Sequence, residues 1–482
     1  MTKSYNYWKI GAIALIAPAL GGSARGSEGD EIRELRAEIK ALELKLNSLE
    51  QREEPREQAA AQAPQAVPIA ATSLPPAPDH EAPPSSRITV DDAGFSFASA
   101  DGSTFINLHG LVQGDSRWFF DNHGIANNNT FVVRRARLIF EGAFDKIFTY
   151  QIVPEFGGGG TGTSNAPVIY DANLGIAVTP EFQLRVGKFK SPIGLEMLQN
   201  DAVLLFNERS LANNLVPSRD VGILGGGSIG GSLLNYTAGV VNGSADNAYT
   251  SNTDTDNDKD FVGRVFLKPF SGTPDSPIAN LGFGVGASAG LQNKTGNLTS
   301  GYKTDGQQTF FTYRSTVLPE GADWRVSPQA NYYSGPFSAQ AEYTVSAVTA
   351  LQGATKAELR NKGWQGSIGY VLTGEKDSYN GFTPKNKFSW QAGTWGAWQV
   401  GLRIADVKLD SDAFPIFADP GASASEATSY GASLNWFLSK AIRVSFDAVQ
   451  TDFERAPGAK TTSNALIAGN EQAFLTRFQV GF

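Results

Sequence analysis

The sequence has no cysteine among its 482 residues, and after residue 20 it has no apolar run long enough to cross a membrane as a helix. The missing cysteine excludes disulfide bonds, thiolate metal sites and thiol redox chemistry. A bilayer-spanning helix needs about 20 consecutive apolar residues. The chain has only three histidines, and none lies beside a serine motif that would suit a hydrolase. We therefore expect no enzymatic activity, no metal and no cofactor.

Glycine and aromatic residues, by contrast, are abundant, with 52 Gly, 30 Phe and 14 Tyr in a chain of formal net charge -8. Glycine tolerates the positive φ angles of tight turns, and aromatic rings gather at membrane interfaces. The last nine residues alternate, so that Phe478, Val480 and Phe482 share one face. Alternating strands without a spanning helix indicate a closed β-barrel in an outer membrane.

The N-terminus has the layout of a secretory signal peptide, which we place at residues 1–26. Lys3 and Lys9 precede an apolar stretch over residues 10–20, and small residues follow it. The stretch is too short for a membrane anchor, so cleavage is expected near Ala24 or Gly26. The mature chain is therefore expected to leave the cytoplasm.

Two further segments precede the barrel. Residues 28–54 carry apolar side chains at heptad spacing, namely Ile32, Leu35, Ile39, Leu42, Leu46 and Leu49. This spacing predicts a short periplasmic coiled-coil helix, with a solvated amphipathic helix as the alternative. Residues 55–94 contain eight prolines among Ala, Gln and Ser, which predicts a Pro/Ala-rich linker.

Residues 95–482 are predicted to form one barrel domain. Over residues 106–118, apolar side chains share one face while His109, Gln113 and Arg117 share the other. Apolar residues then face lipid and polar residues face a wet lumen. Similar segments predict an all-β, 16-stranded antiparallel transmembrane barrel, with strands near residues 105–119, 130–143, 147–157, 168–178, 181–190, 219–229, 232–242, 259–270, 280–291, 322–333, 336–350, 361–373, 396–409, 428–438, 441–454 and 470–482. Such a barrel has both ends in the periplasm and room for an aqueous channel.

Strand parity directs many charged side chains into the lumen. The inward arginines are Arg117, Arg135, Arg137, Arg185, Arg264, Arg325, Arg403, Arg443 and Arg477, and the inward acids are Asp115, Glu141, Glu155, Asp171, Glu342 and Asp447. Arg134 is an exception to parity, and it completes a dense cluster with Arg135 and Arg137. Guanidinium groups stay charged and fit the oxygens of phosphate or carboxylate, so we expect these ten arginines to bind anions in the pore.

Two alternatives exist for these arginines. Arginines paired with inward acids would only brace the wall, because each pair neutralises its own charge. The cluster of Arg134, Arg135 and Arg137 could instead bind lipopolysaccharide phosphates if it lay near a lipid-facing strand end.

Several ordered motifs resemble the phosphate-selective porin O and P family. They are VVRRARL at residues 132–138, GKFKSPIGLE at 187–196, FSAQAEY at 337–343 and YVLTGE at 370–375. The resemblance, which covers residues 95–482, implies a trimer of sixteen-stranded porins whose outer loop at about residues 191–218 folds into the pore. It also implies an arginine ladder, in which Arg134 and Arg135 match the paired arginines of the second strand, and a long periplasmic turn near residues 374–396 that folds inward.

The sequence departs from the phosphate-selective members at three places. No lysine lies between Lys190 and Lys259, and the expected constriction loop carries Asp201 and Glu208. Arg137 stands where those members carry an aromatic residue. The resemblance therefore supports a diffusion porin more strongly than it supports phosphate as the solute.

These observations predict an outer-membrane porin through which small anions, phosphate or polyphosphate among them, diffuse passively. We expect a homotrimer in contact with outer-membrane lipid and lipopolysaccharide, with its N-terminal segment in the periplasm and no nucleic-acid partner. One alternative is a general, weakly selective diffusion porin. Another is a structural tether that clips the envelope through the helix and the linker.

Overall fold

A computed structural model of the protein describes residues 40, 86–92, 94–120, 128–157, 166–248, 252, 254, 256–296, 298 and 301–482. The predicted signal peptide lies outside these residues, as do nearly all of the predicted coiled coil and most of the linker. Among the described residues, no helix is both long and apolar enough to span a membrane. The compact unit that contains the barrel comprises residues 82–482.

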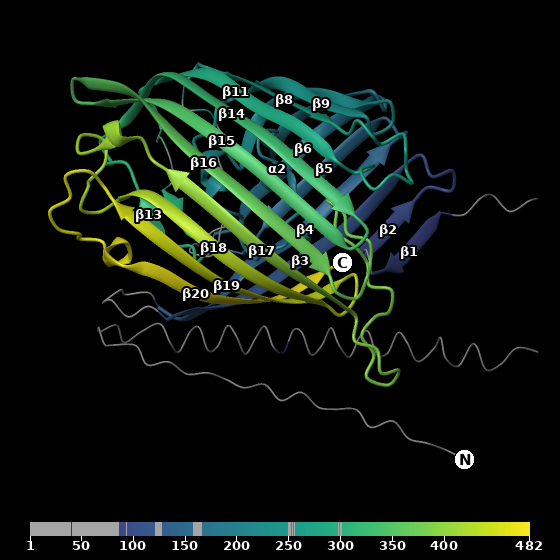
Figure 1. The fold of residues 1–482 in the computed structure, drawn as a ribbon. Helices are drawn as coiled ribbons and strands as arrows, with labels where there is room; N and C mark the ends of the chain where they lie inside the picture. Colours follow the sequence, from purple (N-terminus) through teal and green to yellow (C-terminus); the bar gives the residue numbers. More distant parts are fainter. Residues whose placement is uncertain are drawn as a thin grey trace, which may run out of the picture. The chain divides into compact units, whose positions relative to one another are not determined.

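Sixteen antiparallel strands close into a barrel (Figure 1). Each strand pairs with its neighbours in sequence, and β20 pairs with β3 to complete the wall. The strands are β3 (Phe105–Phe119), β4 (Thr130–Phe144), β5 (Phe148–Glu155), β6 (Val168–Thr179), β7 (Phe182–Lys190), β8 (Arg219–Ile229), β9 (Leu234–Val241), β10 (Asp260–Leu267), β11 (Gly282–Asn293), β14 (Leu318–Ser334), β15 (Phe337–Gln352), β16 (Thr355–Val371), β17 (Ala397–Lys408), β18 (Ala424–Phe437), β19 (Ile442–Arg455) and β20 (Asn470–Gly481). The predicted sixteen-stranded barrel is confirmed.

The starts of three strands differ clearly from the prediction: β14 and β18 each begin about four residues earlier, and β16 differs most. β16 begins at Thr355, whereas the sequence pattern placed its start near residue 361. Gln352 pairs with Thr355 across a two-residue turn, in which Gly353 has a φ of 58°. The predicted strand did not include the charged residues after that turn, which continue the strand beyond the apolar band.

A hairpin precedes the barrel in sequence. It consists of β1 (Arg87–Asp91) and β2 (Gly94–Ala98), and β2 pairs with the first residues of β3. The folded part of the chain therefore begins before residue 94, where the linker was expected to end. Extended structure at β1 was missed because the segment directly follows the proline-rich stretch.

Burial along the strands follows the opposite rule to that of a soluble protein. In β20, Glu471, Arg477 and Gln479 are buried, whereas the side chain of Phe478 is 63% exposed and that of Val480 is 44% exposed. Polar residues thus point into the barrel and apolar residues point outward. This pattern is that of a wall in contact with lipid.

The wall is uneven in strand length. β14, β15 and β16 have 17, 16 and 17 residues, whereas β5, β9 and β10 have 8 each. The turn at Gly353 marks the outer end of the long strands. The C-terminus and the hairpin of β1 and β2 lie at the opposite, periplasmic end (Figure 1).

Several outer loops fold back inside the barrel and pack against inward-facing residues of β15 to β18. They carry the short elements η2 (Leu211–Leu215), β12 (Tyr302–Lys303), β13 (Thr309–Phe311), η3 (Ser411–Ala413) and η4 (Ala465–Ala468). Their apolar core includes Leu215, Tyr302, Phe310, Phe311 and Phe417, each no more than 1% exposed. One sector of the interior is therefore filled by packed loop side chains rather than by solvent.

Candidate functional site

The loop between β7 and β8, residues 191–218, extends into the lumen and is attached to several strands of the wall. Near its start, the backbone N–H groups of Leu195 and Glu196 donate to Glu342 of β15, at 3.0 and 3.2 Å, at the beginning of helix α2 (Leu195–Leu198). Further along, the N–H of Asn207 donates to Asp447 of β19 at 2.7 Å. The loop is thus the constriction element that the resemblance implied, and we call it the constriction loop.

Inward-facing glycines make room for the constriction loop. A Cβ atom at Gly286 of β11 would lie 2.2 Å from the carbonyl oxygen of Ile193, and one at Gly401 of β17 would lie 2.7 Å from the side chain of Leu205. Contacts under 3.0 Å are essentially never found for real Cβ atoms. These strand glycines therefore allow close packing of the loop rather than a turn.

A β-bulge explains why two adjacent arginines both point inward. Arg135 pairs with Gln113 and Val133 pairs with Gly114, so Arg134 is an extra residue in β4. Both arginine side chains are 1% exposed. This arrangement accounts for the parity exception noted in the sequence. It also buries the cluster inside the barrel, so its proposed contact with lipopolysaccharide is wrong.

Glu208 of the constriction loop is the hub of one group of arginines. Arg134 binds its carboxylate with two hydrogen bonds, of 2.7 and 2.8 Å, and Arg477 binds it at 2.7 Å. Arg117 lies 3.9 Å away. Burial alone would raise the pKa of Glu208, but Arg134 and Arg477 outweigh burial and hold it well below its usual range. The loop is thus fixed to β4 and β20 by a carboxylate that Arg134 and Arg477 share.

Asp201 of the same loop is the hub of a second group. It pairs with Arg137, with Arg135 at 3.4 Å and with Arg209 at 2.6 Å. Arg137 also binds Glu155 of β5. Burial would raise the pKa of Asp201, but the charges of Arg135 and Arg209 outweigh burial and lower it well below its usual range. The densest basic cluster of the sequence is therefore occupied by loop carboxylates.

Two more predicted pore arginines bind loop acids as well. Arg403 of β17 pairs with Asp305 and with Glu196, the latter at 3.2 Å. Arg325 of β14 pairs with Asp246 at 2.6 Å. Seven of the ten arginines thus have carboxylate partners, namely Arg117, Arg134, Arg135, Arg137, Arg325, Arg403 and Arg477. Their contacts agree with the alternative in which paired arginines brace the structure, although most of the acids come from loops rather than from the wall.

The other three arginines, Arg185, Arg264 and Arg443, form no ion pair with any residue in the described part of the chain. Arg443 is 2% exposed and donates to the carbonyl oxygen of Leu204 in the constriction loop at 2.8 Å. Arg264 donates twice to Gln329, at 2.9 and 2.8 Å. Arg185 has an exposed side chain. Of these three arginines, only Arg185 and Arg264 contact open space in the lumen.

Arg185 and Arg264 line a cavity of about 500 Å³ between helix α2 and the periplasmic turns, which we call the vestibule. Lys268, just beyond the end of β10, lines it too. Gln183, Ser228, Asn235 and Thr237 add polar groups, and none of the described lining residues is Asp or Glu. The vestibule is therefore an open space whose described lining carries three positive charges and no negative charge.

The sequence prediction omitted several basic residues. Lys268 could have been found, because it continues the parity of Arg264. Arg209 lies in the constriction loop, where strand parity gives no direction. Arg219 stacks on Tyr170 of β6, with its guanidinium 3.6 Å from the ring centre, and Arg137 lies 3.9 Å from the same ring. No sequence pattern indicates such a shared ring.

The profile of the family described as phosphate-selective porin O and P matches residues 106–482. The chain belongs to this family. The porin is similar to the outer membrane channel DcaP of Acinetobacter baumannii, with 12% identity and a TM-score of 0.50 over 81% of this chain and 100% of that one. It is also similar to the anion-selective porin from Comamonas acidovorans, with 11% identity and a TM-score of 0.49 over 79% and 100% of the two chains. Among curated proteins, no sequence matches.

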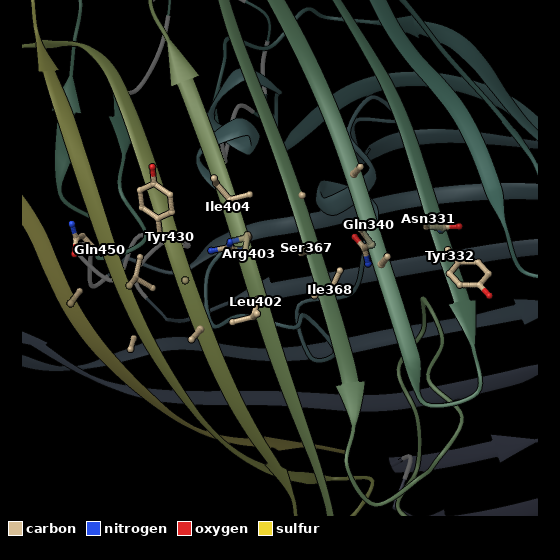
Figure 2. A pocket seen from close by; sticks show the side chains of 18 of the residues that line it. Asn331, Tyr332, Gln340, Ser367, Ile368, Leu402, Arg403, Ile404, Tyr430 and Gln450 are labelled. Atoms are coloured by element: carbon tan, nitrogen blue, oxygen red, sulfur yellow. The ribbon is translucent and has the colours of Figure 1, made fainter.

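A second hollow of the porin, of about 1040 Å³, lies outside the pore (Figure 2). It extends across the outer face of β14 to β20 and is lined by outward-pointing side chains such as Tyr332, Ile368, Leu402 and Tyr430. Leu402 is 57% exposed and Ile368 is 48% exposed. In an outer-membrane channel this apolar hollow faces lipid, so the candidate solute site is the vestibule.

Proposed function

We propose that this outer-membrane porin allows small anions to diffuse passively into the periplasm, with phosphate and polyphosphate as the candidate solutes. The main support is the vestibule, where Arg185, Arg264 and Lys268 face open space with no carboxylate in the lining. Cations that are already paired attract an anion weakly, because their charge is neutralised. Unpaired cations attract it directly, so these three residues are the best candidates for solute contact.

The chemistry of these groups suits transport rather than tight binding. Arginine presents a planar fork of donors to phosphate or carboxylate oxygens, and lysine presents a mobile point charge. Conduction requires several weak sites in series, because a tightly held ion blocks the pore. The vestibule supplies such spaced, hydrated cations on the periplasmic side of the constriction loop.

The constriction supports the same sign of selectivity to a smaller extent. Around Asp201 and Glu208, six guanidinium groups face four carboxylates, namely those of Arg117, Arg134, Arg135, Arg137, Arg209 and Arg477 against Asp115, Glu155, Asp201 and Glu208. The excess is positive, but most of the charge is locally neutralised.

That neutralisation favours a second candidate, a general diffusion porin with little charge preference. The two functions differ in the zero-current potential of planar bilayers under a potassium chloride gradient. Anion transport predicts a clear anion-favouring sign. A potential near zero, or one of cation-favouring sign, would rule out selective anion transport.

The decisive variant combines Arg185→Glu with Arg264→Glu. We expect it to abolish or reverse the anion-favouring potential, because the vestibule wall then carries net negative charge. Arg360→Glu is the matched control, since Arg360 lies at the outer end of β16 and its side chain is 59% exposed, beside Glu358. An unchanged potential in the double variant would show that residues outside the vestibule determine the selectivity.

We also propose a homotrimer, as the family resemblance implies, with residues 28–54 as a periplasmic coiled coil. Chemical cross-linking of the full chain in native membranes tests this. We expect cross-linked products up to the trimer and none larger. The tether alternative predicts that liposomes containing the protein admit neither sugars nor salts, which a swelling assay measures.

A further inference from the structure

A second unusual feature lies at the periplasmic rim, in the long turn between β16 and β17. Its first half folds inward, as the resemblance implied, because the hydroxyl of Tyr379 donates to the carbonyl oxygen of Leu195 at 2.6 Å. Its second half folds outward instead. There, residues 388–395 form a small hairpin next to the periplasmic ends of β17 and β18, which we call the tryptophan hairpin.

The tryptophan hairpin is held in a defined shape by hydrogen bonds. Ser389 and Thr394 exchange backbone hydrogen bonds of 3.0 and 3.1 Å, and the hydroxyl of Thr394 donates to the carbonyl oxygen of Lys387 at 2.6 Å. Gly393 takes a φ of 65°, which suits a tight turn. The side chains at its tip are therefore presented in a fixed direction.

The hairpin is attached to the outer face of the wall. Trp398 and Trp436 are outward-facing partners on β17 and β18, and their rings stack at 5.1 Å. The indole N–H of Trp436 donates to the carbonyl oxygen of Trp395 at 2.7 Å, and the ring of Phe388 lies 5.5 Å from that of Trp436. The hairpin thus lies on the lipid side of the rim rather than in the lumen.

The hairpin exposes large aromatic surface. Trp390 is 81% exposed and Trp395 is 56% exposed, and their rings are 6.2 Å apart. Moving such a side chain out of water is favourable, because the hydrophobic effect grows with the apolar area that is removed from water. Residues 388–398 contain no charged side chain, so nothing in the segment opposes contact with a bilayer.

We propose that the tryptophan hairpin lies in the headgroup region of the periplasmic leaflet, with Trp390 inserted among phospholipids. Its place supports lipid as the occupant, because it continues the apolar outer face at the height where β17 begins and β18 ends. Tryptophan prefers this region, where its ring is in an apolar layer and its N–H reaches water. The long turn then anchors the porin laterally, outside the barrel wall.

The absence of cysteine from the sequence allows a direct test. In the full chain, reconstituted into phospholipid bilayers, Trp390→Cys provides a single thiol for a nitroxide label, and Lys376→Cys provides a control at an exposed, charged position in the same turn. Electron paramagnetic resonance then compares the collision rates of each label with oxygen, which concentrates in lipid, and with a nickel chelate, which stays in water.

We expect the ratio of oxygen to nickel accessibility to be severalfold higher at position 390 than at position 376. Equal ratios would place the hairpin in water, and low accessibility to both reagents would show that protein covers it; either result overturns the proposal. If Trp390→Cys does not fold, Trp390→Phe serves instead. Brominated lipids should quench less of the total fluorescence in that variant than in the unmodified porin, and equal quenching would contradict insertion.

Discussion

Arginines at the constriction and arginines in the vestibule have the same side chain but different surroundings. Arg134 is 1% exposed and shares Glu208 with Arg477, whereas Arg185 is exposed and forms no ion pair with a described residue. The first kind fixes a loop, and the second kind faces water. Arginine content along a pore therefore does not measure its affinity for anions, because the position of the acids decides which charges are available.

The comparison predicts that substitution of the two kinds of arginine changes the stability of the protein by different amounts. Arg134→Ala should have the largest effect on stability, about 3 kcal/mol, because it leaves a buried carboxylate short of a partner. Thermal unfolding in detergent measures this loss. Arg185→Ala is the counterpart, and its unfolding should change by less than about 0.5 kcal/mol because the site is exposed. Similar losses in both variants would contradict the distinction.

A smaller effect is expected where the constriction loop touches the wall. Gly286→Ala places a methyl group against the carbonyl oxygen of Ile193 and should destabilise the folded barrel by about 1–3 kcal/mol, the usual cost of overpacking. Single-channel conductance should change as well, because the loop has to shift. Gly366→Ala is the matched control, since a Cβ atom there meets nothing within 4 Å. Equal behaviour of the two variants would show that the loop is not packed as described.

The smallest effect should come from Lys268→Gln. It removes one of the three vestibule charges, so the zero-current potential should fall without changing sign, and thermal stability should stay within about 0.5 kcal/mol. Lys356→Gln, at the outer end of β16, changes the same charge far from the vestibule and should leave the potential unaltered. A full loss of selectivity on removing Lys268 alone would make it the dominant group rather than one of three.

Alternation along the strands was sufficient to predict the barrel and the inward direction of nine arginines. It works because a wall between lipid and water imposes a strict period of two on every strand. Arg134 shows its limit, because a bulge moves one residue out of phase and nothing in VVRRARL indicates which residue is extra. The polar start of β16 shows another limit, because a strand that extends beyond the membrane no longer needs an apolar face.

The partners of the arginines could not be predicted from the strands. Glu208 is 74 residues from Arg134 and 269 from Arg477, and its place in the lumen depends on how a whole loop folds. The family resemblance indicated that the loop enters the pore, but not which carboxylate meets which guanidinium. The abundance of glycine was likewise attributed to turns in general, although Gly286 and Gly401 lie within strands and make room for that loop.

The uneven strands have a consequence for the membrane around the porin. With a rise of about 3.3 Å per residue and a tilt of about 40°, the 8 residues of β9 or β10 reach a height of about 20 Å, and the 16 residues of β15 reach about 40 Å. The apolar band of an outer-membrane barrel is about 25 Å tall, so the long strands extend beyond it, whereas the short strands are about 5 Å too short to span it. Beside the short strands, the surrounding lipid has to thin or be replaced by protein. Hydrophobic mismatch therefore favours contact with neighbouring proteins on this side of the barrel.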